Sequence, residues 1–219
     1  MIAKTTTRWL CTTALLAMPF MAQAVDGITD AANDFLSTFA GSSSSTDLDV
    51  RSANVLYDVN SNLFKLTATV GGAIGLTPSG FFVWGVNRGA GVANFAANGI
   101  AGVRFDSTVI LRPTGASTAG GQPLAASAIT IVGNTITAVV SGTVLASNGF
   151  ANKLDYTWNL WPRDGAFAGF AAISDFAPDN ANFSATAGAV PVPEPQTLAL
   201  LLAGLGAIGW KARRRAVQR

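Results

Sequence analysis

The chain has 219 residues, with 14 Lys and Arg against 12 Asp and Glu, no His and one Cys. The absence of His excludes Ser-His-Asp hydrolysis and the common zinc sites, and a lone Cys cannot form an intramolecular disulfide. Residues 25–190 contain seven Lys or Arg and eleven Asp, which gives this middle part a net charge of −4. The sequence pI of about 9.0 therefore comes from the two ends of the chain, and no nucleic-acid partner is expected.

The first 24 residues have the features of a signal peptide. Lys4 and Arg8 precede an apolar stretch from Trp9 to Met21, and Ala22-Gln23-Ala24 supplies the small residues at which signal peptidase cleaves. We expect cleavage after Ala24, which removes Cys11 and leaves the exported chain without cysteine. The core alone must then hold the exported domain together.

Residues 25–190 are long enough for one exported domain, and their first element is predicted to be helical. Asp26 lies near the start of this element, Gly41 lies just past its end, and the four serines at 42–45 then predict a loop. The apolar residues that recur at helical spacing are Ile28, Ala31, Ala32, Phe35, Leu36 and Phe39.

After the serines, apolar residues recur with a period of two, which predicts β-strands. Strands are expected at 53–59, 63–70, 105–112 and 154–161. Many short strands with Gly-rich turns and no second periodic helix predict a mainly β domain, an antiparallel β-sandwich with one N-terminal helix.

The segment AITIVGNTITAVV predicts a hairpin around Gly133-Asn134, because this dipeptide suits a two-residue turn. The cross-strand pairs that the turn sets are Ile131 with Ile136 and Ile129 with Ala138. Both pairs are expected on one face of the sheet.

Residues 25–190 also lack Glu, so only aspartates remain as a general acid and base. A glycosidase needs two such carboxyl groups, and the candidates are Asp47, Asp49, Asp106, Asp155, Asp164, Asp175 and Asp179. Asp is also the ordinary turn residue of an exported β protein, which favours a structural role for each. The sequence therefore indicates no catalytic residues, no cofactor and no enzymatic activity.

Two oxygen-rich segments are partly similar to calcium loops. Asp58, Asn60 and Asn62 have the opening spacing of such a loop, but Leu63 replaces its glycine and Thr69 its bidentate acid. We expect a hairpin turn there, and no metal site is assigned. A calcium site is kept as the alternative to an ordinary loop for Asp175, Asp179, Asn180 and Asn182.

The segment DYTWNLWPR, residues 155–163, places a Trp on each face of its predicted strand. Tyr156, Trp158 and Leu160 share one face, whereas Thr157, Asn159 and Trp161 share the other. An exposed Trp161 or Trp84 would stack on a sugar ring, and packing in the core is the alternative. Arg88 and Arg163 would then bond sugar hydroxyls or acidic groups, or instead form salt bridges with Asp.

Residues 191–219 combine three parts, each with a consequence at a membrane. Pro191, Pro193 and Pro195 keep the segment around Glu194 extended. The uncharged run from Thr197 to Trp210 predicts an apolar transmembrane helix, of marginal length unless the basic side chains after it reach the interface. Those residues, which predict a cytoplasmic C-terminus, are Lys211, Arg213, Arg214 and Arg215.

Together with the signal peptide, this tail resembles the PEP-CTERM sorting domain of exported proteins in Gram-negative bacteria. The matching residues are Val192, Pro193, Glu194 and Pro195, followed by the apolar helix and the Arg cluster. The resemblance implies that an exosortase-type membrane enzyme processes the chain near this motif. It also implies a precursor anchored in the inner membrane, a final place at the cell surface or outside, and exopolysaccharide as a partner.

We therefore expect an exported, non-enzymatic structural or adhesive component of an exopolysaccharide or biofilm matrix. The alternative is a carbohydrate-binding module, which needs a groove with exposed Trp, or an Asp-dependent glycoside hydrolase, which needs two facing carboxyl groups.

Overall fold

The computed structural model describes residues 27–190, and this part of the chain consists of β-strands without an α-helix. Its strands are β1 (Ile28–Thr29), β2 (Val50–Asp58), β3 (Leu63–Val70), β4 (Gly80–Asn87), β5 (Ser107–Leu111), β6 (Ser117–Ala119), β7 (Gln122–Leu124), β8 (Ile129–Val132), β9 (Thr135–Ser141), β10 (Thr157–Asp164), β11 (Phe183–Ser184) and β12 (Thr186–Ala187). Short 3-10 helices lie between them: η1 (Thr46–Leu48), η2 (Ala96–Asn98), η3 (Ala126–Ala128), η4 (Lys153–Asp155) and η5 (Gly169–Ala172).

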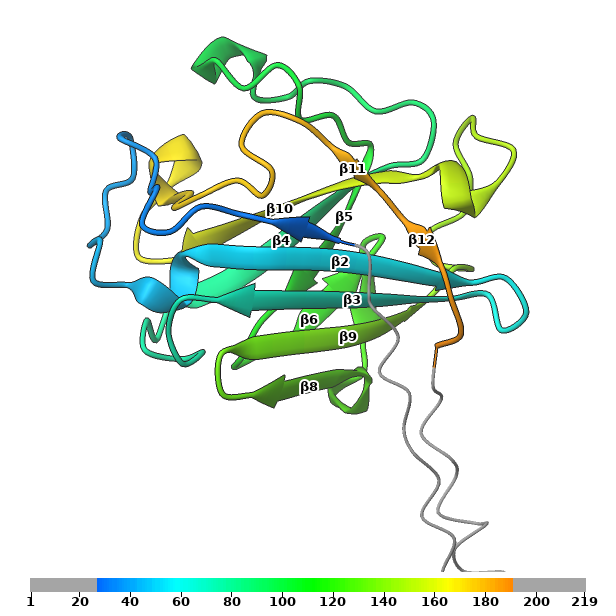
Figure 1. The fold of residues 1–219 in the computed structure, drawn as a ribbon, viewed down its shortest axis with the longest axis horizontal. Helices are drawn as coiled ribbons and strands as arrows, with labels where there is room; N and C mark the ends of the chain where they lie inside the picture. Colours follow the sequence, from blue (N-terminus) through cyan, green and yellow to red (C-terminus); the bar gives the residue numbers. More distant parts are fainter. Residues whose placement is uncertain (1–26, 191–219) are drawn as a thin grey trace, which may run out of the picture.

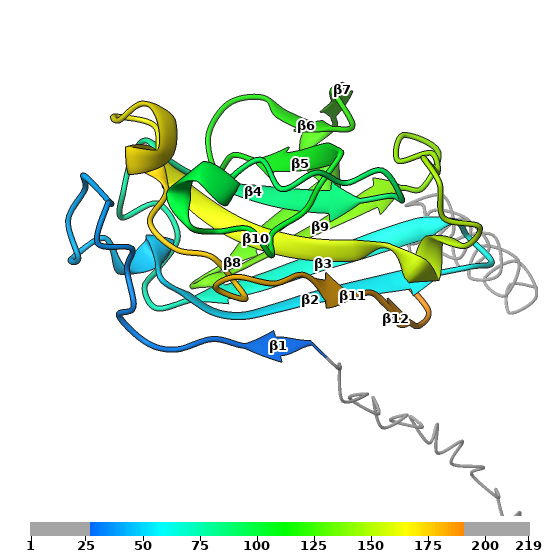
Figure 2. The same ribbon diagram turned by 90° about the horizontal axis from the view of Figure 1, so that it is seen from above.

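The strands form two sheets that pack face to face, as Figure 1 and Figure 2 show. The first sheet has the order β1-β2-β3-β9-β8, with β12 also paired to β2, and the second has the order β11-β10-β4-β5-β6-β7. β12 runs parallel to β2, whereas the other strand pairs of the described chain are antiparallel. The predicted antiparallel sandwich is confirmed.

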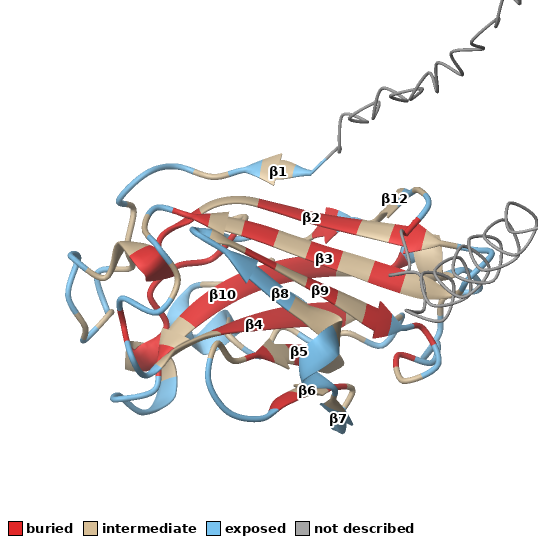
Figure 3. Ribbon diagram, turned by 90° about the horizontal axis from the view of Figure 1, so that it is seen from below, coloured by how far each residue is buried: buried red, intermediate tan, exposed pale blue. Residues whose placement is uncertain are grey.

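The inner core lies between the two sheets and follows from the period-two pattern. In β3 every second residue is buried, and Figure 3 shows this alternation along the strand. The ring of Phe64 in β3 lies 5.2 Å from Trp158 and 5.8 Å from Tyr156 on the opposite side of the core. Burying one side chain of this size contributes roughly 1.5–3 kcal/mol, so these contacts are strong enough to hold a domain that has no disulfide.

Both predicted turns are found. Ile131 pairs with Ile136 and Ile129 with Ala138, as expected, and Gly133 adopts a φ of 60° that glycine tolerates without strain. Between β2 and β3, the Asp58 carboxylate accepts the backbone N–H of Asn60 at 2.9 Å. This is an Asx turn within a hairpin, the role expected for that segment.

The predicted N-terminal helix is wrong. Residues 28–29 form β1 on the edge of β2, and the chain from Asp30 to Ser45 is irregular. The apolar side chains of this segment serve two different clusters, because Ile28 packs on the inner core and Leu36 packs on the far face of the second sheet. One helix cannot present its apolar face to both. The backbone N–H groups of Leu36 and Ala40 instead donate to the carbonyls of Ser174 and Ala171.

The second sheet is also apolar on its outer face. There Trp161 of β10 and Val83 of β4 pack with Val103, Ile173 and Phe176, which come from the connecting segments. We call this group, with the partly buried rings around it, the outer cluster. The two-faced pattern predicted for β10 is therefore confirmed: Trp158 and Leu160 join the inner core, and Trp161 joins the outer cluster.

The predicted signal peptide and the tail from residue 191 onward, with its predicted apolar helix, lie outside the described residues. Within residues 27–190, no helix has the length and apolar character needed to cross a membrane.

Gly85 leaves room for the Trp161 indole, so replacing Gly85 tests the packing of the outer cluster. A Cβ atom at Gly85 would lie 2.4 Å from Cζ3 of the indole. We predict that Gly85→Ala lowers the free energy of unfolding by about 1–3 kcal/mol, because a packed ring must move. Urea unfolding checks this value. Gly188→Ala is the matched control, since its nearest neighbour is the flexible Leu56 side chain at 3.2 Å, and an equal loss in both variants would contradict the assignment.

Candidate functional site

The two tryptophans that the sequence suggested as sugar platforms are not available for stacking. Trp84 is 0 % exposed in the inner core, and Trp161 is 2 % exposed in the outer cluster. The rings of Phe95 and Phe105 lie 5.2 Å and 4.9 Å from the Trp161 ring. Core packing, the alternative given for both residues, explains their positions.

Trp161 nevertheless forms part of the floor of an open groove of about 560 Å³ on the outer face of the second sheet. Its wall residues come from β4, from β5 and the residue directly after it, from β10 and the turn after it, and from the segment 88–106. They are Phe81, Val83, Phe95, Phe105, Thr108, Ile110, Arg112, Trp161, Arg163, Gly165 and Phe167. We call this site the aromatic groove. Phe167 is 38 % exposed, so its ring is accessible to a ligand.

Two arginines give the aromatic groove its charge. The Arg112 guanidinium lies over the Phe81 ring, 4.1 Å from its centroid, in a cation–π contact. Arg163 donates from Nη2 to the carbonyl of Gly169 at 2.6 Å, and burial lowers the pKa of its guanidinium. The ion pairs of the described residues use Arg51 and Arg88, so neither groove arginine is neutralised by a carboxylate there. The salt bridge that the sequence suggested as one alternative for Arg163 is not formed within residues 27–190.

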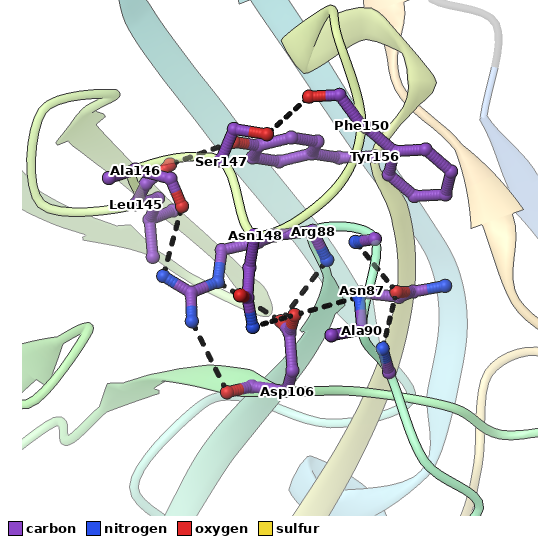
Figure 4. A network of polar contacts seen from close by, with 12 residues as sticks. Asn87, Arg88, Ala90, Asp106, Leu145, Ala146, Ser147, Asn148, Phe150 and Tyr156 are labelled. Carbon is purple, nitrogen blue, oxygen red and sulfur yellow. Dashed lines mark hydrogen bonds and ion pairs between the residues drawn. The ribbon is translucent and has the colours of Figure 1, made fainter.

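Arg88 forms the salt bridge that the sequence suggested for it, and Figure 4 shows the surrounding network. Its Nε lies 3.0 Å from Asp106 Oδ1, and its Nη1 donates to the carbonyl of Ala146 at 3.0 Å. Asn148 donates to the other Asp106 oxygen at 3.0 Å. Burial raises the pKa of Asp106, but the hydrogen bonds from Arg88, Asn148 and Ala90 outweigh it and lower that pKa. This network holds the segment 143–150 against the loop after β4 and is structural.

Other candidate aspartates also have structural roles. Asp47 accepts the backbone N–H and the hydroxyl of Thr77, both at 2.7 Å, and so fixes the turn before β4. Asp164 accepts the Ser79 hydroxyl and the backbone N–H of Ala166 in the turn after β10. These contacts agree with the turn role that sequence reasoning favoured over catalysis.

The oxygen-rich set predicted around residue 175 does not come together as one loop. Asn180 accepts the N–H of Gly102, and Asn182 accepts the N–H of Arg104, so both amides fasten a neighbouring segment. Asp175 instead lies beside Asp30 and Asp34, which sequence reasoning missed because they belong to the segment that it expected to be helical. Asp30 and Asp34 are four residues apart, and this spacing alone did not identify them as a candidate site.

Asp30, Asp34 and Asp175 form what we call the carboxylate cluster. One carboxylate oxygen of each lies within 4.8 Å of those of the other two. Burial, with the charges of Asp34 and Asp179, raises the pKa of Asp30 to about 7, and burial with the charge of Asp30 raises the pKa of Asp175 to about 8. Without a bound cation, Asp30 and Asp175 therefore retain protons near neutral pH.

The carboxylate cluster makes stability depend on pH. The unfolded chain releases these protons near pH 4, so their stabilising effect is complete below about pH 4 and is lost as pH rises to about 8. We predict that, in buffer with a chelator, the free energy of unfolding falls between pH 5 and pH 8. His is the side chain that usually titrates between pH 5 and pH 8, and the chain has none, so His does not contribute to this change in stability.

Urea unfolding across that pH range is the measurement. Asp175→Asn should flatten the profile, whereas Asp155→Asn, at an exposed residue outside the cluster, should leave it unchanged. A stability that rises with pH in the wild-type protein would contradict the assignment.

Comparison with known proteins identifies the part of the chain beyond the described residues. A family model described as the PEP-CTERM protein-sorting motif matches residues 191–215. This range contains the motif from Val192 to Pro195 and the basic residues from Lys211 to Arg215. No curated protein and no solved structure matches the chain. The chain therefore carries a PEP-CTERM sorting motif, which supports a PEP-CTERM sorting-domain protein and implies export, a membrane-anchored precursor and an exosortase-type enzyme as its processing partner.

Proposed function

We propose that the exported β-sandwich is a non-enzymatic, adhesive component of an exopolysaccharide matrix and that it binds acidic polysaccharide in the aromatic groove. The observation that carries this proposal is the pair Arg112 and Arg163, set among accessible rings and without carboxylate partners among residues 27–190. A guanidinium binds a carboxylate through two parallel N–H donors, which suits the acid groups of uronic acid residues.

The aromatic part of the groove supports the same ligand class. Phe81, Phe105 and Phe167 offer flat apolar faces or edges on which the C–H groups of a sugar ring can pack. Because the Phe81 ring also supports Arg112, an acidic sugar that binds the guanidinium would lie next to an apolar surface. The predicted stacking role thus moves from the buried tryptophans to neighbouring phenylalanines.

The chemistry of the groove favours binding over hydrolysis. Glycoside hydrolysis requires two carboxyl groups on opposite sides of the scissile bond, about 5–10 Å apart. The groove lining, which belongs wholly to the described chain, contains two guanidinium groups and no carboxylate. The aspartates of the carboxylate cluster do not line the groove and belong to the segments around residues 30–34 and 175.

Sorting would precede this role. We propose that signal peptidase cleaves after Ala24 and that the exosortase-type enzyme reads the motif from Val192 to Pro195. The basic residues from Lys211 to Arg215 would keep the C-terminus cytoplasmic until processing. The sandwich then reaches the cell surface or the medium.

The test is a binding measurement with two probes, alginate as an acidic polysaccharide and dextran as a neutral one, in buffer with a chelator. We predict that the exported protein binds alginate and not dextran. The double variant Arg112→Gln and Arg163→Gln should weaken alginate binding at least tenfold, because each lost charged contact contributes about 1 kcal/mol or more.

Arg104→Gln is the matched control, since this exposed arginine lies outside the groove. Urea midpoints verify that all variants remain folded. Equal binding by the double variant and the control would overturn the groove assignment, and growth of reducing ends in alginate during incubation would overturn the non-enzymatic one.

A further inference from the structure

We propose that Asp30, Asp34 and Asp175 bind a divalent cation of the calcium class, which fastens the N-terminal segment, residues 28–40, to the sandwich. This site is separate from the aromatic groove and does not depend on polysaccharide binding. It rests on the arrangement of three carboxylates from two distant parts of the chain.

The spacing of the carboxylates fits one shared ion. Calcium binds its oxygen ligands at 2.3–2.6 Å, so two ligands of the same ion are at most about 5 Å apart. One oxygen from each aspartate lies within 4.8 Å of the other two, which meets this limit. Three carboxylates supply three to six of the roughly six to eight oxygens that calcium takes, and water can supply the rest.

The hydrogen bonds of Asp175 point to a ligand independently of the cluster. Asp175 is only 1 % exposed, and its Oδ2 accepts the backbone N–H of Val50 at 3.0 Å. Its Oδ1 is buried and has no hydrogen-bond partner in the described chain, and the same is true of Asp30 Oδ2 and Asp34 Oδ1. An unpaired buried carboxylate oxygen costs free energy, and three of them in one place are satisfied together by a cation.

The charges around the carboxylate cluster do little to neutralise its negative charge. Asp49 and Asp179 both lie near enough to Asp30 to raise its pKa further. Arg51 forms an ion pair with Asp49 at 3.4 Å and is partly exposed, so its charge is directed to that carboxylate. Hard carboxylate oxygens without nitrogen or sulfur ligands favour calcium or magnesium over zinc. A site built from three carboxylates, with water completing the shell and no fixed octahedral cage of protein ligands, favours the larger ion.

The position of the site would let a bound ion link two distant parts of the chain. Hydrogen bonds from its backbone help to hold the N-terminal segment, such as Asp30 N–H to the Arg51 carbonyl at 3.0 Å and Asn33 N–H to Asp49 Oδ1 at 3.0 Å. Asp30 and Asp34 belong to this segment, whereas Asp175 belongs to the strip after η5 that lies against the start of β2. A shared ion would join these two parts across the carboxylate cluster.

Calorimetric titration of the exported protein with CaCl₂ tests the proposal. We expect one bound ion per chain, with a Kd on the order of 0.1–1 mM as in other extracellular sites. At 10 mM CaCl₂ the Tm should rise by several degrees, and exchange of the Leu36 and Ala40 amides should slow at least tenfold. MgCl₂ should bind more weakly.

Asp175→Asn is the principal variant, because an asparagine oxygen can still accept the Val50 N–H. It should fold, should be more stable than the wild-type protein in chelator at pH 8, and should lose the response to calcium. Asp34→Asn, at a less buried residue, should lose calcium binding as well, and Asp155→Asn should retain it. Calcium binding that persists in both Asp175→Asn and Asp34→Asn would overturn the proposal, as would tighter binding of MgCl₂.

Discussion

The structure depends on the burial of the second sheet on both of its faces. Along β10, Trp158 and Leu160 pack into the inner core while Trp161 packs outward, where Gly85 leaves room for its indole. A sandwich normally exposes the outer face of each sheet to solvent, so a second apolar face requires a cover. Here the connecting segments supply it, with Phe95 and Phe105 from one segment and Ile173 and Phe176 from another.

This cover positions both candidate sites. The aromatic groove is the part of the outer face that the connecting segments leave open, and its rings other than Phe167 are also members of the outer cluster. In the strip from Ile173 to Phe176, the side chains of Ile173 and Phe176 pack on the outer cluster. The side chains of Ser174 and Asp175 between them form hydrogen bonds with the chain around β2. The same segment thus closes the cluster and presents the most buried carboxylate to Asp30 and Asp34.

Local signals in the sequence predicted the parts of the fold that form locally. The hairpins at 58–62 and at Gly133-Asn134 combine a period-two pattern of apolar residues with turn residues, and the structure has both in the predicted place. The sorting motif is similarly local, because its prolines, apolar run and basic cluster lie in one continuous stretch. The N-terminal helix was wrong because helical spacing does not reveal that Ile28 and Leu36 belong to different clusters.

The candidate sites could be predicted only in part. Alternation showed that Trp158 and Trp161 face opposite ways, but the cover over Trp161 comes from aperiodic segments whose position no local pattern gives. The carboxylate cluster joins Asp175 to residues near the N-terminus, and that contact depends on the backbone bonds of Leu36 and Ala40 to the strip after β10. Sequence reasoning grouped Asp175 with Asp179, Asn180 and Asn182 as candidate ligands, whereas the structure places its carboxylate beside those of Asp30 and Asp34.

The most direct measurement is hydrogen exchange in a Trp161→Leu variant, since the outer cluster is the element on which both sites depend. Removing the indole should cost a few kcal/mol locally. Amides in 92–105 and 170–177 should then exchange at least tenfold faster, while those of β3 and β9 keep their protection. Uniform acceleration across both sheets, or no change in the two covering segments, would contradict it.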